Sequence, residues 1–240
     1  MQKVNLLNDK IIQKNLASFE GGLSYSKDEG RKPWARYSSF DYCFNYFQGF
    51  KNKEELISKN NIQNSCLHLA FYLASWGMLR GSSFLLQKSI KFYEPLIEYI
   101  SKKDDNFWRI DVHNYTENNN IEKLIDCAIK MKQILSEEGK NKVSDTLITK
   151  IMLGVFGNVP AFDSYFKTGS GLNTFNKHAL NQITIFYKNE NYTEIISREA
   201  SKIKTFEYHN ELKRERSYTS AKIIDMIFFI QGFEKNANLK

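Results

Sequence analysis

The sequence predicts an all-α protein, and three observations favour that fold class. Apolar residues recur at helical spacing through most of the 240 residues. No segment of useful length alternates apolar and polar residues as a half-buried strand does. Glycines and prolines interrupt the periodic segments and so limit their length. We expect about eight to ten helices in one compact domain, residues 1–240, or in two packed lobes with a cleft, residues 60–165 forming the central lobe.

The first half of the chain contains one long loop and several expected helices. Residues 20–40 are rich in glycine and serine, which is typical of a loop or hairpin. Residues 66–79 are apolar nearly all round, so this helix is expected to be central and buried. Pro95 marks either a kink or a new first turn. The expected helices are residues 4–19, 38–48, 53–59, 66–79 and 84–102, whereas 104–120 is a loop or a short helix flanked by loops.

The second half contains the clearest amphipathic segment, residues 121–137, which Gly139 ends. Ser144 and Asp145 can cap the helix that follows. A basic connector at 209–222 leads into a last apolar helix. The remaining expected helices are residues 146–156, a short one after Asp163, 173–188, 192–205 and 223–233. Seven apolar positions are predicted to be buried: Leu67, Phe71, Leu73, Ile125, Ile129, Ile151 and Leu153.

The charge balance favours a polyanionic partner. Lysine and arginine exceed aspartate and glutamate by 34 to 27, which gives a net charge of +7, and such an excess is typical of proteins that bind nucleic acid. Lysine-rich chains also arise wherever coding DNA is AT-rich, and that explanation stays open. The basic residues expected to contact phosphates are Lys140, Lys142, Lys213, Arg214 and Arg216.

Other function classes find little support in the sequence. The four histidines, His68, His113, His178 and His209, are isolated, so we expect no metal site and no cofactor. Cys43, Cys66 and Cys127 stand in apolar surroundings and are predicted to be buried thiols of a reducing compartment. No apolar run reaches the length of a membrane span, and the first segment lacks the apolar core of a signal peptide, so we expect a cytoplasmic protein without a membrane partner.

Two stretches carry candidate functional residues. In 76–83, Trp76 and Arg80 lie at a glycine-containing break, and Arg80 is expected to reach a carboxylate, a helix C-terminus or a cleft. In 157–166, Asp163 follows a proline stop and lies between aromatic residues. Asp163 is either the cap of the helix that begins at Ser164 or a catalytic carboxylate, and both roles are compatible.

The segment 120–166 resembles the helix-hairpin-helix DNA glycosylase superfamily. In that family a hairpin is followed by a helix and then by a Val-Pro-Val-Asp loop that carries the catalytic aspartate. The loop "NVPAFD" is similar, with one extra residue, and it places Asp163 at the matching position. The turn 139–143 falls where the hairpin belongs, without its second glycine, and Lys142 lies near the lysine that bifunctional members use as nucleophile.

The resemblance implies a DNA-binding protein that excises a base. A glycosylase extrudes a nucleotide into a pocket, where aromatic rings stack on the base and basic groups hold the phosphates. Asp163 would face the sugar, with Lys142 as the candidate nucleophile. The alternative is a helical module without catalysis that binds nucleic acid or a protein through a basic face. The residues expected to bind the substrate are Trp76, Arg80, Lys140, Lys150 and Tyr165.

Overall fold

A computed structural model of the chain describes residues 2–21, 31–209 and 214–237, without the side chains of residues 190, 191 and 214. The described chain is mostly helical, as the sequence predicts. Its α-helices are α1 (Asp9–Glu20), α2 (Ser39–Gly49), α3 (Ile62–Ser75), α4 (Glu94–Ser101), α5 (Asp105–Trp108), α6 (Asn120–Ser136), α7 (Asp145–Phe156), α8 (Ser164–Ser170), α9 (Lys177–Tyr187), α10 (Glu190–Lys202) and α11 (Ser220–Ala237). Five short 3₁₀ turns, Arg36–Ser38, Lys53–Ile57, Phe84–Gln87, Ile90–Tyr93 and Val112–Asn114, lie among them.

Polar side chains at the first positions explain where many helices begin. Ser144 accepts a hydrogen bond from the backbone N–H of Leu147 at the start of α7, as the sequence predicts. Pro95 lies in the first turn of α4, so it begins a helix there and does not kink one. The expected helix 84–102 is therefore two 3₁₀ turns followed by the short α4.

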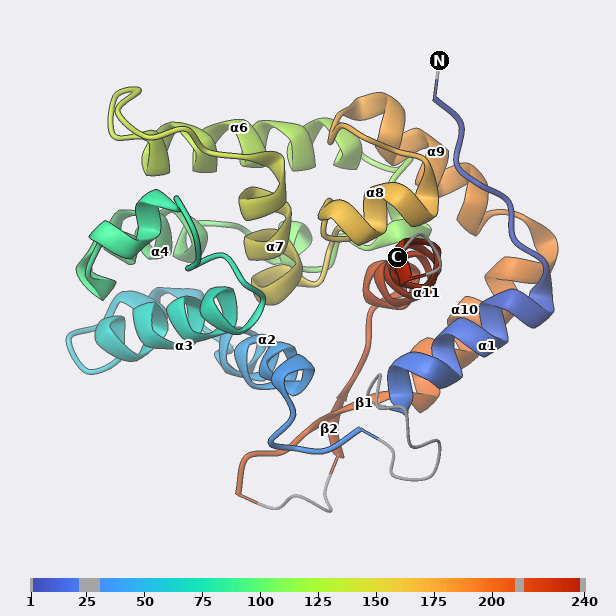
Figure 1. Cartoon of the computed structure of the whole chain (residues 1–240). Helices are drawn as coiled ribbons and strands as arrows, with labels where there is room; N and C mark the ends of the chain where they lie inside the picture. Colours follow the sequence, from blue (N-terminus) through green and yellow to red (C-terminus); the bar gives the residue numbers. More distant parts are fainter. Residues whose placement is uncertain (1, 22–30, 210–213, 238–240) are drawn as a thin grey trace.

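Helix α11 is enclosed over most of its length, because every residue from Ser220 to Ile230 is buried. Figure 1 shows it end-on, between α8 and the neighbouring pair α1 and α10. Two glycines bring α8 and α11 together: a Cβ atom added at Gly169 would overlap the carbonyl oxygen of Phe228, and one added at Gly232 would overlap that of Tyr165. The two backbones are thus in direct contact.

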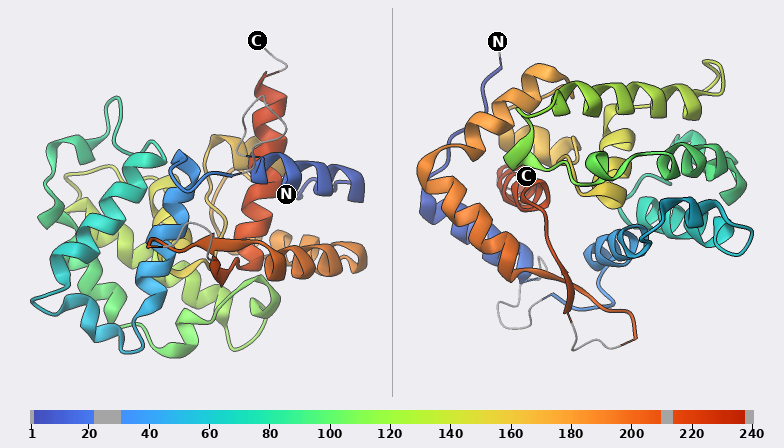
Figure 2. Two further views of the ribbon diagram at one scale, coloured as in Figure 1. Left: turned by 90° about the horizontal axis from the view of Figure 1, so that it is seen from below. Right: turned by 180° about the vertical axis from the view of Figure 1, so that it is seen from behind.

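The helices α2, α3, α4, α6 and α7 pack on one another on the other side of the molecule. Figure 2, in the view from below, shows α1, α10 and α11 on one side and these helices on the other. Gly154 of α7 lies against the ring of Tyr72 on α3, where a side chain would overlap the ring. This close approach fixes how α3, which ends just before Trp76, and α7, which carries Lys150, lie relative to each other.

A two-stranded antiparallel sheet, β1 (Lys204–Phe206) and β2 (Arg214–Ser217), corrects the expectation of a chain without strands. It pairs Lys204 with Ser217 and Phe206 with Arg214. The buried carboxylate of Asp41 holds the sheet to α2, because it accepts hydrogen bonds from Phe206 N at 2.9 Å and from the Tyr218 hydroxyl at 2.5 Å. The expected helix 192–205 ends early, at Lys202, because strand β1 begins two residues later, at Lys204.

Three of the seven predicted core positions are wrong. Leu67, Phe71 and Ile129 are exposed by 42%, 70% and 50%, and Ile125 is half-buried. Helix α3 buries only the face that carries Cys66, Leu69 and Leu73. Its outer face is also apolar but is exposed to solvent, and Leu67 and Phe71 lie on it. The positions Leu73, Ile151 and Leu153 are buried as predicted.

Candidate functional site

The loop that leads to Asp163 is fixed at several points. Helix α7 ends at Gly157, whose left-handed backbone (φ 69°) is a conformation that glycine adopts without strain. The residues from Asn158 to Phe162 are all buried. Ala161 N donates to the carboxylate of Asp225 on α11 at 2.9 Å, and Phe162 N donates to the Thr149 hydroxyl at 2.8 Å. The position of Asp163 is therefore set by both α7 and α11.

Asp163 is the N-cap of α8 and also one half of a buried ion pair. Its Oδ1 accepts a hydrogen bond from Phe166 N at 3.0 Å, which is the capping role that the sequence allows. Its Oδ2 accepts one from Lys150 Nζ, also at 3.0 Å. The Lys150 side chain is 3% exposed and that of Asp163 is 13% exposed. Asp163 is the more accessible partner of the pair.

A second buried pair lies beside the first. Lys222 Nζ is 2.9 Å from Asp225 Oδ2, and the two side chains are 1% and 3% exposed. The ring of Trp76 is near both ammonium groups, with its centroid 4.8 Å from Lys150 Nζ and 4.9 Å from Lys222 Nζ. Buried charges are tolerated when they are paired, and an indole ring adds cation–π attraction. The site thus holds two cations and two anions around one indole.

Aromatic rings surround this ion-pair cluster. The ring centroids of Tyr37 and Trp76 are 5.1 Å apart, and those of Tyr165 and Phe229 are also 5.1 Å apart. Burial raises the pKa of the Tyr37 hydroxyl, and Tyr165 and Asp163 raise that pKa further against the opposing effect of Arg36. Tyr37 therefore stays protonated at neutral pH. The buried indole N–H of Trp76 has no hydrogen-bond acceptor among the described residues, and such a group is rare in a folded protein.

The turn between α6 and α7 forms one wall of a basic groove. Three basic residues line this groove of about 430 Å³, Arg80 from the segment after α3 and Lys140 and Lys142 from the turn. The turn contains Glu137 and Glu138 in left-handed conformations (φ 45° and 61°), which are uncommon outside glycine. The remaining residues that line the basic groove are Gly77, Met78, Ser82, Ser83, Phe84, Asn141, Ser144 and Leu147.

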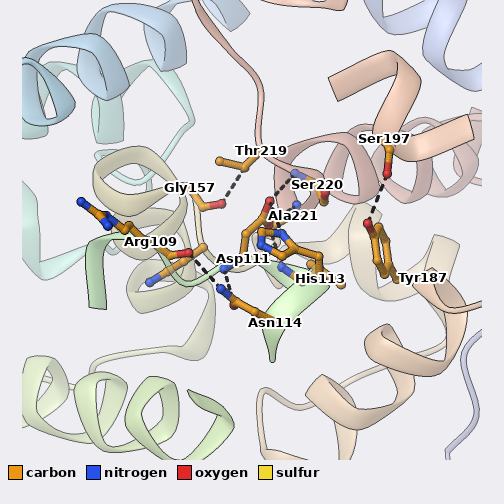
Figure 3. Close-up of polar contacts among 12 residues, drawn as sticks. Arg109, Asp111, His113, Asn114, Gly157, Tyr187, Ser197, Thr219, Ser220 and Ala221 are labelled. Carbon is orange, nitrogen blue, oxygen red and sulfur yellow. Dashed lines mark hydrogen bonds and ion pairs between the residues drawn. The ribbon is translucent and has the colours of Figure 1, made fainter. Parts of the chain in front are cut away.

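Figure 3 shows how the first turn of α11, and with it the Lys222–Asp225 pair, is held in place. The Asp111 carboxylate accepts hydrogen bonds from Ser220 N at 2.8 Å and Ala221 N at 2.9 Å. The Thr219 hydroxyl donates to the Gly157 carbonyl at 2.6 Å. His113 Nδ1 lies 3.7 Å from Asp111 Oδ2, and this contact raises the pKa of His113. The negative charge of Asp111 also stabilises α11 electrostatically, because the N-terminus of a helix is the positive end of its dipole.

The structure divides the predicted site residues into two groups. In the first group, Asp163 bonds to Lys150, and the Lys150 ammonium lies over the ring of Trp76. Tyr165 is on α8, two residues after Asp163. Arg80, Lys140 and Lys142 are in the basic groove, and Arg80 packs over Gly77 without a carboxylate partner among the described residues. The lysine bonded to Asp163 is Lys150, while Lys142 is exposed in the groove.

The remaining basic candidates lie apart from these two groups. Arg216 pairs with the neighbouring Glu215, whose carboxylate is 3.4 Å away. Lys213 lies outside the described residues, and so does the side chain of Arg214.

Tyr37, Lys222 and Asp225 belong to the cluster but were not predicted. Lys222 and Asp225 stand three residues apart in the apolar segment "AKIIDMIFFI". Two opposite charges at that spacing on an otherwise apolar helix indicate a buried pair, and this signal was available in the sequence. Tyr37 had no comparable signal, because it lies in a loop rich in aromatic and basic residues.

Comparison with models of protein families, with curated proteins and with solved structures finds no match for this chain. Within the described residues, no group of three or more histidine, cysteine, aspartate or glutamate side chains could hold a metal ion. The three cysteines are buried and unpaired, as predicted, and burial raises the pKa of the Cys66 and Cys127 thiols to about 11. No helix in the described part of the chain is both long and apolar enough to cross a membrane.

Proposed function

We propose that this protein binds DNA and releases a base from an extruded nucleotide at Asp163. The observation that carries the proposal is the Asp163–Lys150 pair, a carboxylate and an amine 3.0 Å apart beside the ring of Trp76, with Tyr165 two residues further along α8. Aromatic rings stack on an extruded base, and a carboxylate stabilises the positive charge that develops on the sugar as the glycosidic bond breaks. The buried indole N–H of Trp76 has no acceptor among the described residues, and in this proposal it donates to the base once the site has opened.

The basic groove supplies the DNA contacts in this proposal. Arg80, Lys140 and Lys142 lie in one groove beside the first turn of α7, and cations with backbone N–H groups are the usual phosphate ligands. The arrangement of α6, a turn, α7 and a loop ending at Asp163 agrees in order with the helix-hairpin-helix glycosylase pattern. The agreement concerns the order of these elements along the chain. It supports the proposal by analogy and does not indicate common ancestry.

Two lysines compete for the role of nucleophile. The resemblance favours Lys142, whereas the contact with Asp163 favours Lys150. In the Lys150 route, the Lys150 ammonium gives its proton to the leaving base, and the freed amine bonds to C1′ as the C1′–base bond breaks. The Asp163 carboxylate stays charged and faces the sugar. The C1′–O4′ bond then breaks, a proton moves from the nitrogen to O4′, and borohydride reduces the protonated imine that is left to a stable adduct. In the hydrolytic route, water replaces the amine and no adduct forms.

The second candidate function is a helical module that binds nucleic acid without catalysis. It is favoured by the observation that both oxygens of Asp163 already have partners, Phe166 N and Lys150 Nζ. Entry of a base requires Tyr37 and Tyr165, which are half-buried, to move. A module with a purely structural Asp163 needs no such movement.

Abasic-site formation on duplexes that each carry one modified or mismatched base tests the proposal. The wild-type protein should release at least one of the bases, and Asp163→Asn should release it about 10²-fold more slowly. Asp104→Asn is the matched control, because Asp104 caps α5 through Phe107 N and has no lysine partner. The assay is run where circular dichroism shows each variant folded. No release of any base by the wild type refutes the catalytic proposal.

Borohydride trapping then separates the two lysines. If Lys150 is the nucleophile, Lys150→Gln abolishes the trapped adduct and Lys142→Gln retains it. The reverse pattern assigns the role to Lys142. Base release without any adduct assigns the hydrolytic route. Release at equal rates by the wild type and by Asp163→Asn refutes the role given to Asp163.

A further inference from the structure

A second hollow, the aromatic groove, lies between α2, α3 and the segment 33–36. Its volume is about 530 Å³, within the range usual for ligand sites. It takes side chains from the loop before α2, from the outer face of α3 and from Tyr208, which follows β1. Its lining residues are Pro33, Trp34, Ala35, Arg36, Ser39, Tyr42, Cys43, Leu67, His68, Phe71, Ser75 and Tyr208.

Three large aromatic side chains of this groove are open to solvent. Trp34 and Tyr208 are each 74% exposed and Phe71 is 70% exposed. Tyr208 lies edge-on against Tyr42, with ring centroids 5.6 Å apart. A single exposed aromatic residue needs no explanation, but several around one hollow mark a binding surface. The exposed rings are therefore surfaces on which another flat ring can stack.

The charges of the aromatic groove favour an anionic occupant. Among the residues that the structure describes, its lining includes the cation Arg36 and no aspartate or glutamate. Burial lowers the pKa of His68, which stacks on Tyr46 at 4.0 Å, so this histidine is neutral at neutral pH. The chain as a whole carries +7. Exposed rings next to a cation, on a basic protein, match the combination that binds single-stranded nucleic acid.

We propose that the aromatic groove binds an unpaired segment of DNA, with bases stacked on Trp34, Phe71 and Tyr208 and a phosphate at Arg36. The proposal shares with the proposed function the assumption that DNA is the partner, and it does not depend on catalysis. The groove lies next to the Asp163 cluster, because Arg36 lines the groove while the adjacent Tyr37 packs on Trp76. A strand in the groove would thus lie close to the ion-pair cluster.

Titration of short labelled oligothymidine by fluorescence anisotropy tests the proposal. Each of Trp34→Ala, Phe71→Ala and Tyr208→Ala should weaken binding by roughly ten- to hundredfold, the loss expected for one stacked base. Ile185→Ala is the control, because Ile185 is similarly exposed, at 58%, and lies on α9 outside the groove. Trp34 is the only highly exposed tryptophan, since Trp76 and Trp108 are buried at 8% and 7%. Its fluorescence should be quenched as the oligonucleotide binds.

Each outcome decides the proposal separately from the proposed function. Binding with Trp34 quenching that the groove variants remove supports it, even if no base is ever released. Binding that all three variants leave unchanged overturns it, and so does the absence of binding at low salt. Concentration-dependent self-association that the same variants abolish also overturns it, because the groove is then a protein interface. Base release by a protein with an inactive groove would leave the proposed function standing alone.

Discussion

Replacing Asp163 with asparagine should destabilise the fold far more than the loss of a helix cap would. Asparagine caps a helix about as well as aspartate, so the bond to Phe166 N can be kept. The charge cannot be kept, and Lys150, whose side chain is only 3% exposed, loses its anionic partner. The ring of Trp76, whose centroid is 4.8 Å from Lys150 Nζ, then remains as a cation–π partner of the ammonium. Removing one partner of a buried ion pair costs about 3–5 kcal/mol.

That free energy corresponds to a fall in melting temperature of about 6–20 °C for a chain of this size. Guanidinium unfolding followed by far-UV circular dichroism measures the free energy of unfolding directly. Asp104→Asn, which keeps a cap and breaks no ion pair, should change it by less than about 0.5 kcal/mol. The double variant Lys150→Met, Asp163→Asn should recover stability to within about 1 kcal/mol of the wild type, because no unpaired charge is left.

Two results would refute this reasoning. If Asp163→Asn is as stable as Asp104→Asn, Lys150 is not held as a buried ammonium. If the double variant is no more stable than Asp163→Asn alone, the loss comes from packing and not from charge. The double variant also serves the base-release assay, as a protein of near wild-type stability that lacks both the Asp163 carboxylate and the Lys150 amine.

Three further predictions concern the groove, the helix contact and the α11 terminus. Replacing the three cations of the basic groove with glutamine should lower the slope of log K against log salt for duplex binding by about 0.9 per cation, and an unchanged slope would place the phosphates elsewhere. Gly232→Ala should destabilise the fold by about 1–3 kcal/mol or more in thermal melts, because it forces α8 from α11, whereas Gly49→Ala, whose added Cβ would lie 4.0 Å from the Arg216 guanidinium, should not. The raised pKa of His113 adds stability that is full below its ordinary pKa of about 6.5 and is lost as pH rises through the folded value. His113→Gln should therefore flatten the dependence of melting temperature on pH in that window, and an unchanged profile would contradict the assignment.

The sequence predicted those parts of the fold that depend on local chemistry. Ser144 as a cap, Gly157 as a stop and Asp163 as a cap follow from side-chain and backbone preferences that act over a few residues. The sequence allows Pro95 to mark either a kink or the first turn of a helix, and in the structure it lies in the first turn of α4. These features can be predicted without knowing which helices pack against each other.

Features that depend on distant contacts were missed. Leu67 and Phe71 repeat at helical spacing like core residues, yet α3 turns them towards the aromatic groove. The strands β1 and β2 have only three and four residues, too short for a period to be read, and Asp41 from α2 fixes them in place. Lys150 was expected at the site as a substrate contact, but its pairing with Asp163 appears only once the loop folds back on α7.

The position of α11 at the centre of the molecule has a consequence for how the chain folds. Residues 220–230 are buried by helices from far earlier in the chain, including α1, whose Asn15 donates to the Ile227 carbonyl at 3.0 Å. A ribosome releases α1 to α10 before α11, so the early helices lack the surface on which they pack until the last helix is made. Contacts of such long sequence separation slow folding. Nascent molecules therefore expose the apolar face of α1 for most of their synthesis, and those of α8 and α10 until α11 is made.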